Sequence, residues 1–216
     1  MKLIHQITSL AITLFFLTAQ PVHAEPMEVM QNDKIPNMIE DLNPFDPNVE
    51  EVLRHYDEIY EEETGQPSHL PDESFINDII GFASCYRSEC AVWAQVVKSS
   101  QRLYLYVHGR LADSWPVSTG KAGYTTPNFD RHPNGRIYDR YTSTKYPEGD
   151  YNGLGNMPYA VFIAGGFALH GTPRGNWPNL GRPASHGCIR MHPDNAYRFN
   201  RLVRSNGIQN VWITVQ

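Results

Sequence analysis

A cysteine and three histidines are the residues of this sequence whose types and spacing could do chemistry. Cys188 lies in GRPASHGCIRMHPDNA, residues 181–196, two residues after His186 and four before His192, and His170 lies upstream in IAGGFALHGTP. Together they could bind a metal ion. Cys188 alone could be half of a disulfide, a buried structural thiol, or a nucleophile activated by a histidine. Which of these holds decides the function.

A metal site is the alternative that we weigh first and find weaker. Zinc takes nitrogen and sulfur ligands, which His186, Cys188, His192 and His170 could supply. His186 and Cys188 are separated by a single residue, however, and no acidic residue nearby is suited to act as general base at an open zinc. We therefore predict a site without a metal ion.

The sequence around Cys188 favours a nucleophile over a buried structural thiol. The cysteine follows a loop rich in proline and glycine, where backbone rather than apolar packing dominates. Gly187 permits a tight turn in which amides can point at a substrate oxygen. His170, which ends a predicted strand at Gly171, could supply the base if it faces the same cleft. The sequence shows that these parts exist, not that they meet.

The N-terminal residues predict export, and export bears on the cysteines. Lys2 is followed by the apolar run LAITLFFLTA and by VHA, which is typical of a secretory signal cleaved near Ala24. The run is too short to span a membrane, so we expect a periplasmic or secreted protein without a transmembrane segment. In an oxidising compartment three cysteines leave one thiol over. Cys85 and Cys90 can close a short loop and leave Cys188 free, but pairing of either with Cys188 stays open.

Residues 25–84 are acidic and residues 85–216 are basic. The first segment carries sixteen acidic side chains against two basic ones, and the second fifteen basic against seven acidic. This shift places a domain boundary near residue 84. Asp46 and Pro47 precede NVEEVLRHYDEIYEEETG and predict a helix at about 47–64 that stops at Gly65. One face of it is apolar, namely Val49, Val52, Leu53, Tyr56, Ile59 and Tyr60.

We expect that face to dock on the basic domain, the alternative being a solvated lead-in. A further hypothesis is that this acidic arm caps the active cleft.

From residue 91 the pattern changes to short strands. Alternating runs separated by turns at KSSQ and HGR occupy residues 91–119, two strands flank Gly165–Gly166, and residues 208–216 form a last strand. Between them, residues 194–207 predict a helix that ends at Gly207, and His192 leads into it. Its inward residues are Ala196, Phe199, Leu202 and Val203. The second segment is therefore a mainly β domain with a late helix, and without a motif for nucleic acid.

At this point the residues carry a family resemblance. His170, followed after fourteen residues by Ser185-His186-Gly187-Cys188-Ile189-Arg190, resembles the signature of the YkuD-type L,D-transpeptidases. QRLYLYVHGRLADSWPVSTGK is similar to the opening hairpin of the family, and AVFIAGGFALHGT to its histidine strand. The resemblance covers residues 91–216. It implies a β-sandwich or barrel-like catalytic domain over residues 85–216, preceded by the acidic, partly helical segment.

The resemblance also implies roles. Cys188 attacks as a thiolate, His170 deprotonates it, and His186 shapes the pocket. The amides of Gly187 and Cys188 help to form the oxyanion hole. Arg190 orders the site, near a carboxylate of the substrate.

Two positions in the site have local roles. Some family members have a serine directly after the base histidine, where this chain has Gly171. The resemblance therefore implies that a backbone carbonyl, instead of a third side chain, orients His170. Ser185 hydrogen-bonds locally and holds the turn.

The resemblance implies a peptidoglycan substrate and no cofactor. The thiolate would attack the carbonyl of the third residue of a stem peptide and expel the terminal D-alanine. The acyl group would then pass to an amine, which gives a 3–3 cross-link or anchors a lipoprotein lysine. Passage to water would instead make the protein an L,D-carboxypeptidase or L,D-endopeptidase. An inactive cell-wall-binding protein and a His/Cys metallohydrolase are further alternatives.

Overall fold

The computed structural model describes residues 43–72, 84–143 and 149–216 of the 216-residue chain. All of the described residues belong to one compact unit, residues 35–216. The predicted signal sequence and the first part of the acidic segment lie outside the described residues. Within the described ranges, no helix is long and apolar enough to cross a membrane.

The larger sheet has five strands in the order β3-β2-β1-β8-β4. They are β1 (Val92–Val97), β2 (Arg102–Val107), β3 (Arg110–Pro116), β4 (Phe129–Arg131) and β8 (Val211–Val215). β1 runs parallel to β8, and the other pairs are antiparallel. Alternate residues of β1 point into the core, as the alternating sequence predicts. His108 and Gly109 both have positive φ in the turn between β2 and β3, which matches the twist of a tight hairpin.

The smaller sheet has the order β5-β6-β7, and it carries the residues of the predicted site. Its strands are β5 (Val161–Ala164), β6 (Phe167–Gly171) and β7 (Ile189–Met191). β5 and β6 form the hairpin predicted about Gly165–Gly166, and β7 lies parallel to β6 on its other side. Three short 3₁₀ helices, Arg87–Glu89, Arg174–Asn179 and Ile208–Asn210, join the larger elements.

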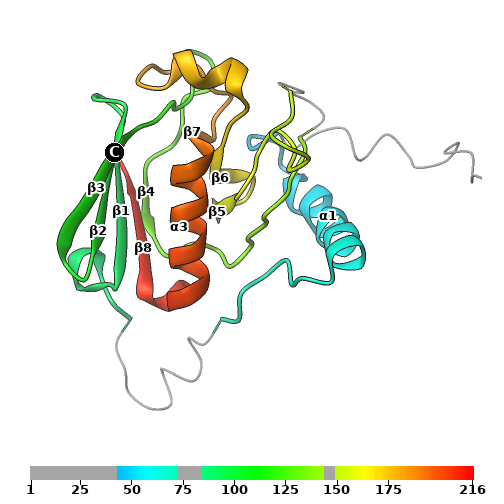
Figure 1. The fold of residues 1–216 in the computed structure, drawn as a ribbon, viewed down its shortest axis with the longest axis horizontal. Helices are drawn as coiled ribbons and strands as arrows, with labels where there is room; N and C mark the ends of the chain where they lie inside the picture. The colour runs from blue at the N-terminus through cyan, green and yellow to red at the C-terminus, as the bar shows by residue number, and fades with distance from the viewer. Residues whose placement is uncertain (1–42, 73–83, 144–148) are drawn as a thin grey trace, which may run out of the picture. The chain divides into compact units, whose positions relative to one another are not determined.

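Helix α3 (Pro193–Asn206) packs against both sheets (Figure 1). Ala196, Phe199 and Val203 are buried in one core with strands of both sheets, and Leu202 packs against that core half-buried. His192 is the N-cap of this helix, as predicted. Two sheets and a late helix confirm the mainly β fold class.

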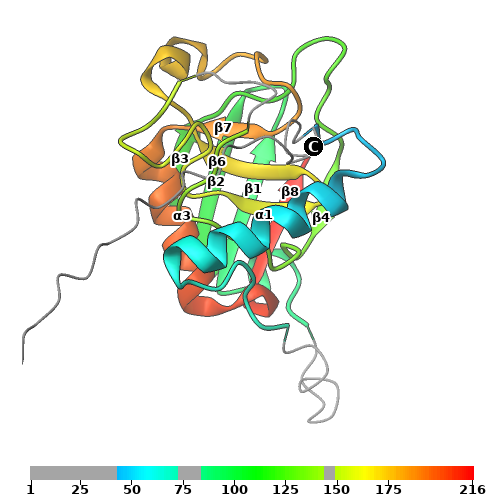
Figure 2. The ribbon, with the colours of Figure 1, turned by 90° about the vertical axis from the view of Figure 1, so that its right-hand side faces the viewer.

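Helix α1 (Val49–Thr64) packs against the smaller sheet, across which it lies in Figure 2. Its Val49, Leu53 and Tyr60 are buried with Phe162 and Ala168 of that sheet.

Helix α1 begins two residues later than predicted. Asp46 is not its N-cap but forms a turn before it, in which the Asp46 carboxylate accepts a hydrogen bond of 2.8 Å from the amide of Asn48. The helix ends at Gly65, which has a φ of 64°.

A buried ion pair fixes α1 to the domain. Asp57, on the face that packs inward, accepts hydrogen bonds from Nε and Nη2 of Arg136 at 2.9–3.2 Å and a further one from the Tyr138 hydroxyl. Glu50, two turns earlier in the helix, accepts a hydrogen bond of 3.0 Å from Nη1 of the same arginine. The opposite charges of the two segments therefore meet in specific pairs.

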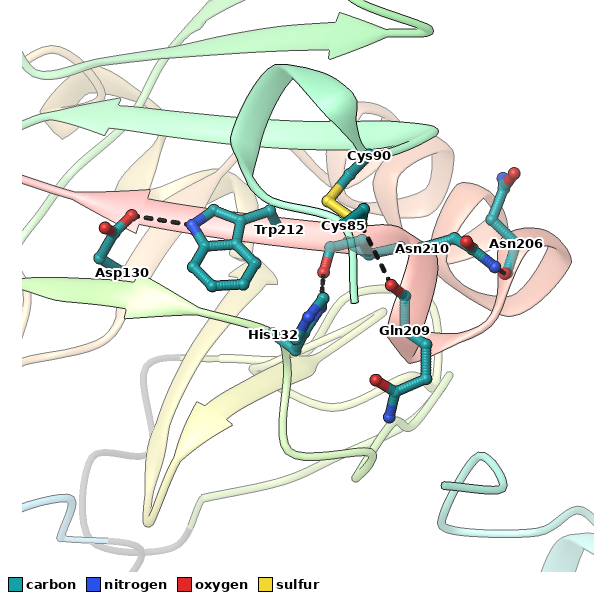
Figure 3. The surroundings of a disulfide bond; sticks show 9 residues. Cys85, Cys90, Asp130, His132, Asn206, Gln209, Asn210 and Trp212 are labelled. Atoms are coloured by element: carbon teal, nitrogen blue, oxygen red, sulfur yellow. Dashed lines mark hydrogen bonds between the residues drawn. A yellow bond between two sulfur atoms is a disulfide. The ribbon is translucent and has the colours of Figure 1, made fainter. Parts of the chain in front are cut away.

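Cys85 and Cys90 are joined by a disulfide, drawn with its surroundings in Figure 3. The Sγ of Cys85 lies 3.1 Å from the carbonyl oxygen of Gln209, so the loop packs against the residues before β8. Cys188 carries a free thiol.

Candidate active site

Parallel strands β6 and β7 bring the predicted nucleophile and base to one face of the smaller sheet. Leu169 is paired with Ile189, and His170 with Arg190. Cys188 directly precedes β7, and successive side chains along a strand point to opposite faces. Cys188, Arg190 and His170 therefore share a face, although eighteen sequence positions separate the cysteine from the histidine.

His170 is held as a neutral base. Its ring is buried, with 3% of the residue exposed, and Nδ1 lies 2.6 Å from the carbonyl oxygen of Gly171. A carbonyl oxygen only accepts hydrogen bonds, so Nδ1 carries the proton and Nε2 keeps its lone pair. Burial, and then the nearby charge of Arg190, lower the pKa of His170 to about 3. At neutral pH the imidazole is therefore neutral, and Nε2 is the atom at which it would accept a proton once its surroundings become more polar.

Cys188 is a buried thiol in this arrangement. It is 8% exposed, and its Sγ donates to the carbonyl oxygen of Gly166 at 3.3 Å. Burial raises the pKa of Cys188 to about 11, while the amide of Ala168 and the charge of Arg190 act in the opposite direction. The resting site thus contains a neutral thiol and a neutral imidazole. Ionisation of the thiol requires that its surroundings become more polar or that its proton passes to His170.

The turn before β7 presents the backbone of Cys188. Gly187 has a φ of 120°, a conformation that favours glycine. The Ser185 hydroxyl donates to the carbonyl of Cys188 at 2.6 Å and accepts from the amide of Gly187 at 3.1 Å. Ser185 therefore holds the turn, and the Gly187 amide that we expected in an oxyanion hole is already engaged. Of the two amides expected to form the oxyanion hole, the Cys188 amide is therefore the candidate donor to a substrate oxygen.

His186 and His192 occupy different surroundings from His170. The ring of His186, in the turn before Cys188, lies edge-on to Tyr124, with 4.9 Å between centroids. His192 caps α3, and its ring packs at a tilt against that of Trp177, with 4.3 Å between centroids. Within the residues that the structure describes, no three His, Cys, Asp or Glu side chains are grouped to hold a metal ion.

Residues of the acidic segment cover the site, which sequence reasoning left as a hypothesis. A Cβ placed on Gly187 would lie 3.0 Å from the Phe45 ring and 3.1 Å from Pro44. Phe45 also packs edge-on against Phe167, with 5.2 Å between ring centroids. Phe45 is itself 45% exposed, so it forms the outer surface above the Cys188 turn.

Tyr141, like Phe45, lies at the site but was not predicted from the sequence. It packs with Cys188 and α1 in one buried cluster, and its burial raises the pKa of its phenol strongly. No sequence motif indicates Tyr141, because it lies in a loop that packs near Cys188 only in the folded chain.

Comparison with known proteins identifies the domain that contains this site. Residues 91–213 match the family model of the L,D-transpeptidase catalytic domain, YkuD. The chain belongs to this family. No curated protein matches the sequence.

Several solved structures are similar to the chain over part of their length. An L,D-transpeptidase from Mycobacterium smegmatis is 24% identical, with a TM-score of 0.46 over 59% of each chain. One from Mycobacterium tuberculosis H37Rv is 22% identical, with a TM-score of 0.46 over 59% of this chain and 58% of its own. One from Stackebrandtia nassauensis is 20% identical, with a TM-score of 0.47 over 61% of this chain and 58% of its own. The alignment thus spans about 58–59% of the length of each of these structures.

Proposed function

We propose that this protein is a cysteine acyltransferase of the cell wall that acts on peptidoglycan stem peptides as an L,D-transpeptidase. The observation that carries the proposal is the arrangement of Cys188 and His170. A free thiol and a neutral imidazole with its Nε2 lone pair available lie on one face of adjacent strands. Membership of the L,D-transpeptidase family supports the choice of substrate class.

The first half-reaction follows from the protonation states of the resting site. A bound stem peptide makes the surroundings of Cys188 more polar, and the thiol proton passes to Nε2 of His170. The thiolate attacks the carbonyl of the third stem residue, and the amide of Cys188 donates to the resulting oxyanion. The imidazolium then protonates the amine of the terminal D-alanine, which leaves as the C–N bond breaks. The products are a thioester on Cys188 and a neutral His170.

The acceptor in the second half-reaction determines whether the protein is a transpeptidase or a hydrolase. An amine attacks the thioester, His170 takes the amine proton, the C–S bond breaks, and His170 returns the proton to the Cys188 thiolate. The new amide is a 3–3 cross-link or an anchored lipoprotein lysine. Attack by water in its place releases a tripeptide, as in an L,D-carboxypeptidase or L,D-endopeptidase. The buried Arg190 lies on the same face and supplies fixed positive charge beside both reacting groups. We place the protein in the periplasm or outside the cell, because the N-terminal residues read as an export signal.

Incubation of the exported protein with disaccharide tetrapeptides, followed by mass spectrometry, tests the proposal. We expect cross-linked dimers together with released D-alanine, and tripeptides alone would indicate the hydrolase. Cys188→Ala and His170→Ala should abolish both products, whereas the matched control His192→Ala should retain them. Full activity of Cys188→Ala, or loss of activity on addition of a chelator, would contradict the cysteine mechanism.

A further inference from the structure

Thr126 contacts the backbone of the Cys188 turn from a loop that joins two strands of the larger sheet. It lies in the loop between β3 and β4 and is completely buried. Its hydroxyl donates to the carbonyl oxygen of Gly187 at 2.6 Å and accepts from the amide of Gly120 at 2.8 Å. The side chain therefore has one defined orientation, with its proton directed at Gly187.

The carbonyl of Gly187 and the amide N–H of Cys188 belong to the same peptide unit. A trans peptide is planar, and its C=O and N–H point in opposite directions. Whatever fixes the carbonyl oxygen of Gly187 therefore also fixes the direction of the Cys188 N–H. Gly187 has no Cβ to restrict its own dihedral angles, so this peptide needs an external contact to hold one orientation.

The neighbouring peptides are held by other groups. Ser185 binds the amide of Gly187 and the carbonyl of Cys188, on either side of the peptide that Thr126 binds. The loop that carries Thr126 is itself held in place. The backbone carbonyl of Thr119, in the same loop, accepts from the amide of Ser185 at 3.0 Å, and Lys98, after β1, donates to the carbonyl of Thr126 at 2.9 Å. The hydrogen bond from Thr126 and the two made by the Ser185 hydroxyl together hold the turn in one conformation.

We propose that Thr126 is a positioning residue for the oxyanion hole, which acts through the Gly187–Cys188 peptide to aim the Cys188 N–H at the carbonyl under attack. The hydrogen bond at the carbonyl also polarises the peptide and strengthens its N–H as a donor. Thr126 does not touch the substrate. This inference rests on the proposed function in one respect, that the reaction of Cys188 passes through an oxyanion.

Two reactions of Cys188 separate this role from a structural one. With 4-nitrophenyl acetate, the S–C bond forms through a tetrahedral oxyanion, the C–O bond breaks, and 4-nitrophenolate leaves a thioester on Cys188. With iodoacetamide, the sulfur displaces iodide in a single step in which no oxyanion forms. Loss of the oxyanion donor therefore slows the first reaction and not the second, whereas a change in access or folding alters both.

The test compares Thr126→Val, which keeps the branched shape without the hydroxyl, with Thr126→Ser, which keeps the hydroxyl. We expect Thr126→Val to slow acylation by the ester about 100-fold, as loss of one oxyanion contact does, and to change alkylation less than about twofold. Thr126→Ser should restore acylation to within about threefold. With stem peptides the loss should fall on kcat rather than on KM.

Thr119→Val is the matched control. Thr119 is a buried threonine of the same loop, and its hydroxyl accepts from Gln101 at 2.7 Å rather than contacting the turn. It should reduce acylation no more than alkylation. Urea unfolding of each variant verifies that rates are compared between folded proteins.

Three results would overturn the inference: equal acylation rates for Thr126→Val and the unmodified chain, parallel losses in both reactions, or a failure of Thr126→Ser to recover. A chain that is acylated by the ester but does not act on stem peptides would refute the proposed function and leave this inference standing. A chain that is alkylated but not acylated would refute both.

Discussion

The protonation state of His170 leads to a quantitative prediction about acid stability. The pKa of a histidine in an unfolded chain is about 6.5, and burial in the folded protein lowers that of His170 to about 3. Between these values the unfolded chain binds a proton at this position that the folded chain does not. The free energy of unfolding therefore decreases as the pH falls through this window.

The magnitude follows from the two pKa values. At pH 6.5 half of the unfolded chains carry the proton, and at pH 5 nearly all do, while His170 in the folded protein stays neutral. The stability contributed by His170 between these pH values should then fall by about 2 kcal/mol. This is a large fraction of the stability of a typical domain.

Urea unfolding at pH 6.5 and at pH 5, followed by tryptophan fluorescence, measures the loss. The comparison is between the unmodified chain and His170→Asn, which removes the titrating ring. Carboxylates titrate in both proteins and cancel in the difference. His192→Asn, at the cap of α3, should retain the full loss. Equal losses in the unmodified chain and in His170→Asn would refute a neutral, buried His170, and with it the base that the mechanism requires.

Three further predictions concern the ion pair of helix α1, the packing of Phe45 over the Cys188 turn, and the thiol of Cys188. Asp57→Ala should reduce the free energy of unfolding by about 3–5 kcal/mol, because it leaves Arg136 buried without its main partner, and a much smaller loss in urea would contradict that pairing. Phe45→Ala should accelerate alkylation of Cys188 about fivefold, since half of a phenylalanine side chain is worth about 1 kcal/mol of burial. The exposed Leu111→Ala should not change that rate, and an unchanged rate in Phe45→Ala would show that the ring does not control access. Alkylation of Cys188 in the folded protein should continue to rise about tenfold per pH unit up to pH 10, because burial raises its pKa to about 11, and a plateau below pH 9 would contradict this.

The sequence by itself was sufficient for features that depend on neighbouring residues. The alternation in β1 and β2, the hairpin about Gly165–Gly166 and the helix after His192 are local patterns, and each forms where it was predicted. The spaced histidine and cysteine motif was enough to indicate the family. Composition also located the acidic segment, and the apolar face of its helix predicted docking on the basic domain, but not the residues that it contacts there.

The state of the site was decided only by the tertiary structure. The pKa values of Cys188 and His170 are set by burial, which depends on every segment packed around them. No sequence pattern indicated a role for Asp57, yet it pairs with Arg136, which is 79 positions away.

The Cys188 turn likewise depends on residues that the sequence did not indicate. It is completed by Thr126, which is 61 positions from Gly187, and covered by Phe45 from the acidic segment. A sequence motif names the residues that react, because their types are restricted by the chemistry. The residues that orient and cover them act through hydrogen bonds and packing that many residue types can supply, so no local pattern marks them until the chain is folded.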